Sequence, residues 1–195
     1  MAHKGVVAAF KLGHMASTMK LVEQLETGAR EAADYFRHLE PIAARTVPIT
    51  PSEHPGGRPW TAKDHLAHLV ARELDFLEIA RRVVAQERDP LRLGHRGSTD
   101  QERAAYVNRE NQINVEDRRP LALTDLLEEL LDLRSQLVSL VAPLSPEDLS
   151  RAITVELGQH VPAHALLGSS DRHAKAHIQL LRATAQQPKR SSSPR

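Results

Sequence analysis

Two histidines, His173 and His177, lie four residues apart in the segment HAKAHIQLL, whose apolar residues recur at helical spacing. On a helix, this spacing places both imidazoles on one face, where they could share one metal ion. Both fall in the apolar sector of the helix, so we expect them to point into the protein. A buried imidazole needs a polar partner, and one metal ion would satisfy two of them. Without a third ligand, two hydrogen-bonded core histidines, or two histidines lining a wet groove, explain the spacing equally well.

A second pair of histidines, His65 and His68, lies in the segment WTAKDHLAHLVARE. Three residues separate the two by about 300° around a helix, so their directions differ by about 60°. His65 lies nearer the apolar sector of this segment, and periodicity slightly favours it as a third ligand. His68, at the margin of the sector, remains the alternative. Glu73 lies on the same apolar side, where it either orients an imidazole or forms a buried ion pair.

The composition limits the chemistry that these residues can do. The chain has 195 residues, a formal net charge of +1 and no cysteine, so any metal must be held by His, Asp or Glu. No basic stripe stands out and aromatic residues make up 3%, which argues against nucleic-acid binding. No apolar run approaches the roughly 20 residues that span a bilayer. We therefore expect a cytoplasmic protein with no nucleic-acid or membrane partner.

Apolar periodicity predicts the helices that position the histidines. Four long amphipathic helices are expected at 17–39, from Thr61 through the segment of His65 and His68, from Thr124 to Pro143, and from Pro162 to about Gln186. A polar helix is expected at 99–114, and an extended connector rather than a sheet strand at AITVEL (152–157). The absence of a sheet pattern predicts an all-α fold, a four-helix bundle with a long crossover between its second and third helices.

The two ends of the chain are expected to lie outside this bundle. Residues 1–16 run into the sequence GHMAS, which resembles a cloning scar, so we predict that they form a vector-derived leader. Residues 17–186 are predicted to form one helical domain. Residues 187–195 carry turn formers and charge without apolar periodicity, so we predict a disordered tail.

The start of the second helix resembles a known motif. A Trp, a polar helix start and a His eight residues after the Trp, followed by Leu, resemble the second-helix motif of the DinB/YfiT-like superfamily. The matching residues are Trp60, Thr61, Lys63, Asp64, Leu66, His68 and Leu69. The last helix of that superfamily carries a His pair, or an acidic residue and a His, four apart, as His173 and His177 are here. The resemblance covers residues 20–185 and implies that the metal ligands are His68, His173 and His177. It overrules the periodicity preference for His65, where the family usually has an apolar residue.

The resemblance also implies an activity. Three histidines leave coordination positions open, as in catalytic metal sites, and zinc is the first choice of ion, with Ni, Fe or Mn able to occupy the same ligands. The implied function is that of a metal-dependent transferase or isomerase, in which a low-molecular-weight thiol such as mycothiol attacks an electrophilic small molecule. A metal-dependent hydrolase and a non-catalytic, stress-related metal-binding protein are the alternatives. Catalytic and thiol-binding residues are not specified, and a homodimer stays open.

Overall fold

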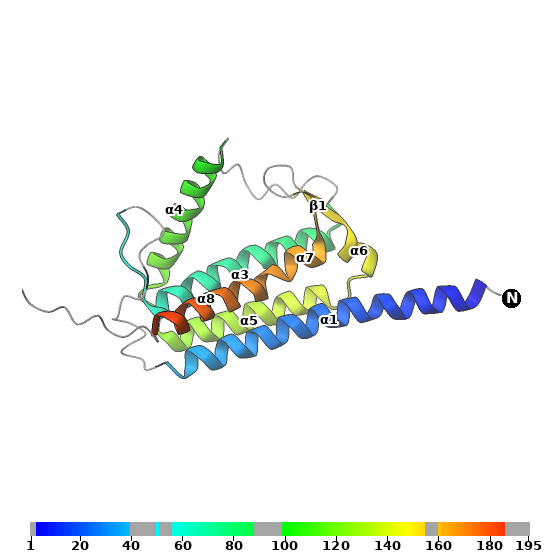
Figure 1. Cartoon of the computed structure of the whole chain (residues 1–195), viewed down its shortest axis with the longest axis horizontal. Coiled ribbons are helices and arrows are strands. Elements are labelled where there is room, and N and C mark those ends of the chain that lie inside the picture. Colours follow the sequence, from blue (N-terminus) through cyan, green and yellow to red (C-terminus); the bar gives the residue numbers. More distant parts are fainter. Residues whose placement is uncertain (1–2, 40–49, 51–55, 88–98, 155–159, 186–195) are drawn as a thin grey trace, which may run out of the picture.

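The computed structural model describes residues 3–39, 50, 56–87, 99–154 and 160–185 (Figure 1). The predicted tail at 187–195 lies outside this part of the chain. The helices are α1 (His3–Arg37), α3 (Ala62–Val84), α4 (Asp100–Arg118), α5 (Leu123–Val141), α6 (Pro146–Ser150), α7 (Ala163–Leu167) and α8 (Ser169–Ala185). The strands are β1 (Ala152–Thr154) and β2 (His160–Pro162). No helix in the described part of the chain is both long and apolar enough to span a bilayer.

The four long helices α1, α3, α5 and α8 form one bundle. α5 packs against both α1 and α3, and α8 packs against the same two helices from the other side. α3 and α5 run in the same direction, and the chain returns between them through α4, which stands away from the bundle axis (Figure 1). The predicted all-α four-helix bundle and its long crossover between the second and third long helices are therefore confirmed.

The core consists of the apolar stripes that the periodicity predicted. Leu126, Leu130 and Leu137 of α5 are at most 2% exposed, and Leu25 and Phe36 of α1 are fully buried. Burial of each such side chain contributes about 1.5–3 kcal/mol relative to exposure. We therefore expect apolar packing, rather than a bound ion, to hold the bundle together.

A buried ion-pair network joins all four long helices. The guanidinium of Arg134 in α5 donates from Nε and Nη2 to the two carboxylate oxygens of Glu73 in α3, at 2.7 and 2.8 Å. It also donates to the carbonyl of Leu25 in α1 at 2.9 Å and to the hydroxyl of Ser170 in α8 at 2.6 Å. Of the two roles open to Glu73, the structure shows the buried ion pair. The network fixes how far α8 is shifted along α3, and so which residues of the two helices face each other.

α3 begins with a capping box at Thr61, the predicted start of the second long helix. The hydroxyl of Thr61 accepts from the backbone N–H of Asp64, and the Asp64 carboxylate accepts in return from the backbone N–H of Thr61. Such a capping box is worth about 0.5–2 kcal/mol. Arg119, just after α4, donates to Asp64 at 2.9 Å and ties the end of the crossover to this cap. The capped start fixes where on α3 the two histidines fall.

Three predicted boundaries were wrong. α1 begins at His3 rather than at residue 17, and its N-terminal part extends beyond the other helices (Figure 1). The vector origin of residues 1–16 stays a prediction. The AITVEL connector begins as β1, which pairs antiparallel with β2. The last helix is broken at Gly168 into α7 and α8, because Gly, Ser and Ser in sequence are weak helix formers. Pro162 caps α7 instead of opening a single long helix.

Candidate metal centre

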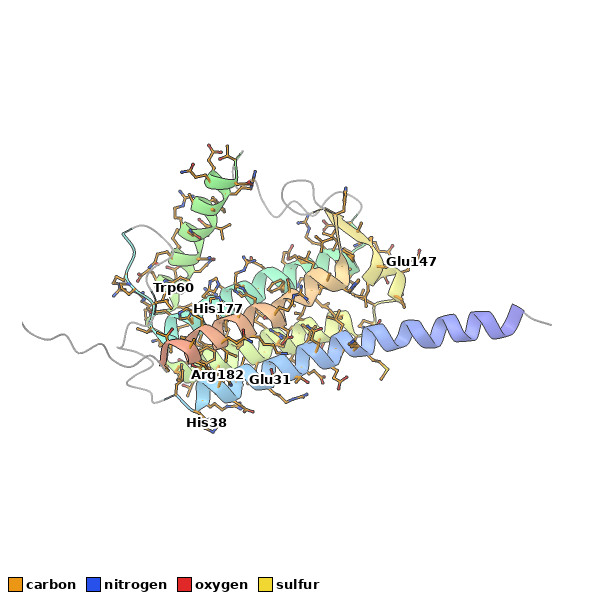
Figure 2. All side chains as sticks on the ribbon, viewed as in Figure 1. Glu31, His38, Trp60, Glu147, His177 and Arg182 are labelled. Atoms are coloured by element: carbon orange, nitrogen blue, oxygen red, sulfur yellow. The ribbon has the colours of Figure 1, made fainter. Side chains whose placement is uncertain are left out.

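Three of the predicted residues converge where α3 meets α8. His68, His173 and His177 each offer one ring nitrogen, and these atoms all lie within 4.8 Å of one another. The Nε2 atoms of His68 and His173 are 2.9 Å apart. Figure 2 shows His177 and Trp60 at the same end of the bundle, where α4 leaves it. The structure therefore brings together the three histidines that the resemblance named.

The packing of α8 explains the inward direction of its two histidines. Ala174, Ile178 and Leu181 are buried, and they place their face of α8 against the bundle. His177, between them on this face, is 9% exposed, and His173, one turn earlier, is half-buried. The apolar sector read from the sequence predicted this direction correctly.

His65 is buried beside this cluster without being part of it. Its Nδ1 lies 2.8 Å from Nδ1 of His177, and its Nε2 lies 3.0 Å from the hydroxyl oxygen of Thr50. Both ring nitrogens of His65 are thus engaged by protein atoms. If His177 offers Nε2 to an ion, its Nδ1 carries a proton that it can donate to Nδ1 of His65, whose Nε2–H then donates to Thr50. This is the arrangement by which an outer residue sets the tautomer and ring orientation of a metal-binding histidine.

Trp60 packs against both histidines of α3. Its ring centroid lies 5.3 Å from those of His65 and His68, and its Nε1–H donates to the side-chain oxygen of Gln112 in α4 at 3.0 Å. The backbone of Trp60 pairs with that of Thr50, which lies 3.0 Å from His65. The Trp of the motif therefore closes the end of the bundle over the imidazoles and holds them in place.

Burial keeps all four imidazoles neutral at neutral pH. It is the main cause that lowers the pKa of His68 to about 2 and that of His173 to about 3, and the nearby His177 lowers both further. Burial likewise lowers the pKa values of His65 and His177 to about 4. Only a neutral imidazole has the lone pair that binds a metal, so the donors are in the ligand-competent state.

The three-histidine cluster fits a divalent ion. Tetrahedral ligands at about 2.0–2.1 Å from zinc lie about 3.3–3.4 Å from one another. This spacing falls between the 2.9 Å that separates Nε2 of His68 from Nε2 of His173 and the 4.8 Å within which all three ligand atoms lie. Nδ1 of His68 is buried, and no described residue forms a hydrogen bond with it.

A pocket of about 460 Å³ opens beside the cluster between α3, α4 and α8. It is lined by His68, Arg72, Phe76, Val107, Asn111, Ser169, Arg172 and His173. Asp171, next to Arg172 in the sequence, is buried, and its carboxylate accepts from Gln24 at 3.0 Å. The pocket gives a small molecule access to two of the three clustered histidines.

The spacing between Arg72 and His68 could have identified Arg72 as a pocket residue from the sequence. Arg72 follows His68 by four residues, so it lies on the same face of the helix one turn later. Arg172 immediately precedes His173. The buried carboxylate of Asp171 faces Gly28 of α1, where an added Cβ would lie 2.0 Å from it. The hydrophobic periodicity of the two helices does not reveal a buried carboxylate on one helix that faces a glycine on the other.

Comparison with known proteins agrees with this fold. The family model described as the DinB superfamily matches residues 24–179. Among solved structures, the chain is similar to the mycothiol-dependent maleylpyruvate isomerase, with a TM-score of 0.59 and 13% identity, over 84% of this chain and 60% of that one. The chain therefore spans less than two thirds of the length of the isomerase.

A second solved structure covers more of both chains. It is YfiT from Bacillus subtilis, described as "a probable metal-dependent hydrolase with an unusual four-helix bundle topology", with a TM-score of 0.62 and 13% identity over 87% of this chain and 86% of that one. At this level of identity, both similarities establish the fold alone. No curated protein sequence matches the chain at a significant level.

Proposed function

Because this chain belongs to the DinB superfamily, we propose that it is a metal-dependent enzyme whose divalent ion is held by His68, His173 and His177. The observation that carries the proposal is the convergence of these three imidazoles, all with lowered pKa values, two of which line an open pocket. A closed structural site would use four protein ligands, whereas three leave a position for a reactant. Zinc is the first choice, and Ni, Fe or Mn suit the same donors.

The residues around the cluster have separate tasks. A divalent ion held by neutral imidazoles supplies a Lewis-acid centre that deprotonates a coordinating thiol outright and lowers the pKa of a bound water. His65 and Thr50 orient the ring of His177, and Trp60 excludes water from the inner side of His65 and His68. The pocket on the other side admits the substrate.

A low-molecular-weight thiol is the proposed nucleophile, so the enzyme would be an S-transferase or an isomerase acting on an electrophilic small molecule. The chain has no cysteine and hence no thiol of its own. Among the described residues that line the pocket there is no carboxylate, and such a base commonly activates water in metal-dependent hydrolases. The thiol route needs no such base. Because the isomerase of similar fold is mycothiol-dependent, mycothiol is the first thiol to try.

Hydrolysis is the second candidate activity, because the description of YfiT names a hydrolase of the same fold. The two activities are separated by assaying the metal-loaded protein with chlorodinitrobenzene plus thiol, and with an activated ester in the absence of thiol. The proposal expects thiol conjugation that disappears in His68→Ala and persists in His38→Ala, a change at an exposed position. Ester hydrolysis without thiol would support the hydrolase instead. Metal binding without either activity would point to the non-catalytic alternative.

A further inference from the structure

The charged side chains that line the pocket beside the histidine cluster are all positive. Two of its eight lining residues, Arg72 and Arg172, carry a guanidinium, and none of the described lining residues carries a carboxylate. Any divalent ion bound by the histidines in its wall would add further positive charge. The pocket is therefore an electropositive site, and an anion in it would be attracted by every nearby charged group of the lining.

Both arginines keep donors that can bind a ligand. Arg72 uses Nη1 to bond the half-exposed carboxylate of Asp75 at 2.5 Å, and its guanidinium lies 5.8 Å from the ring centroid of Phe76. Arg172 donates from Nη2 to the carbonyl of Ala165 at 2.8 Å, and no described carboxylate pairs with it. A guanidinium has five N–H donors in a planar fork that matches two oxygens of an anion. Each arginine therefore has unused capacity.

Both arginines lie beside the histidine cluster, in the same pocket lining as His68 and His173. Arg72 stands one helical turn from His68, and Arg172 is the residue next to His173. An anion held by these arginines would thus lie within a small molecule's length of the clustered imidazoles.

The remaining wall is partly apolar. Phe76 and Val107 supply apolar surface, and Ser169 and Asn111 supply small polar groups. Pockets of about 300–1,000 Å³ with a few polar groups on an apolar lining are typical of small-molecule sites. The lining thus suits a molecule that has both an anionic group and an apolar part.

We propose that this pocket binds a substrate carrying a carboxylate beside an apolar portion, and that Arg72 and Arg172 form its anion subsite. The placement of this subsite next to the reacting atoms rests on the proposed function. Carboxylate binding itself requires only the two arginines, so it can be measured without metal. The subsite would orient the substrate with its uncharged, reactive end toward His68 and His173.

The test uses benzoate as the anionic probe and benzamide as its neutral counterpart, titrated by calorimetry into the metal-free full chain. Benzoate should bind at least about tenfold more tightly than benzamide, because a charge-assisted bidentate hydrogen bond is worth about that factor or more. Arg72→Gln and Arg172→Gln should each weaken benzoate by about tenfold and leave benzamide unchanged. Arg109→Gln, at an exposed position on α4 outside the lining, is the matched control and should bind both probes as the unaltered chain does.

The outcomes separate this proposal from the metal-enzyme proposal. Equal binding of benzoate and benzamide, or unchanged benzoate binding in both glutamine variants, would overturn the anion subsite whatever the metal site does. Inorganic phosphate binding as tightly as benzoate would overturn the assignment of a carboxylate with an apolar part. Retained benzoate selectivity in a chain that binds no divalent metal would keep the subsite and remove the enzyme proposal.

Discussion

His65 shows how a single residue can support a site without belonging to it. Periodicity favoured His65 over His68, yet the structure places His68 in the three-histidine group and His65 behind His177. The helix pattern could not decide because every residue from Ala62 to Ala71 is buried, so the first turns of α3 have no solvent-facing side. When a helix is buried on all sides, its hydrophobic periodicity does not show which face points toward the site. Trp60 does not distinguish the two histidines either, because its ring centroid lies 5.3 Å from both imidazoles.

The buried histidines predict how acid affects the metal-free protein. Their folded-state pKa values of about 2 to 4 lie below the ordinary 6.5, so between these limits the unfolded chain binds more protons than the folded one. The free energy of unfolding should therefore fall as the pH drops from about 6.5 toward about 5.5, by up to about 1.4 kcal/mol per pH unit for each histidine. Urea unfolding across this window measures it.

A matched pair of variants assigns that pH effect to the cluster. His173→Gln removes one buried imidazole and should make the dependence shallower, whereas His38→Gln, at an exposed position, should leave it as it is in the unaltered chain. A free energy of unfolding that stays constant between about pH 6.5 and 5.5 would show that the imidazoles are not held neutral by the fold.

The elements were largely predictable, and the failures have physical causes. The cap at Thr61 marked the start of α3, and the leucine stripe marked α5. The break at Gly168 was missed because the apolar stripe continues across it from Leu167 to Ala174, and periodicity registers the face of a helix rather than its continuity. The ion pair between Glu73 and Arg134 was left open because partners on different helices are not visible in one helix's pattern.

Loss of that ion pair should weaken the junction of the four long helices. Glu73→Ala leaves the guanidinium of Arg134 buried without its carboxylate, which costs about 3–5 kcal/mol of unfolding free energy. Arg30→Ala breaks an exposed pair with Glu26 in α1 and should cost less than about 1 kcal/mol. Chemical denaturation of both variants gives the comparison. Similar small losses in the two would mean that the network does not hold the register of α3 and α8.

At the scale of the whole molecule, the bundle and the candidate centre are separable. The core lies along the four long helices, whereas the histidine cluster lies between α3 and α8, at the end of the bundle where Figure 2 labels His177 and Trp60. The fold class, the crossover and the convergence of His68 with His173 and His177 follow from sequence pattern and family resemblance. The pocket and its arginines do not, because they arise from the angle at which α4 stands away from the bundle. Variants at the histidines should therefore keep their helical circular dichroism.

The most direct test is a zinc titration of the metal-free chain and of His68→Ala, His177→Ala and His65→Ala, with circular dichroism as the check on folding. Removal of His68 or His177 should lower zinc affinity by orders of magnitude, because each is a proposed ligand. Removal of His65 should lower it by about tenfold to a hundredfold, as for a residue that orients a ligand through a hydrogen bond. A folded His68→Ala that binds zinc like the unaltered chain, or a larger loss in His65→Ala than in His68→Ala, would contradict the proposed three-histidine centre.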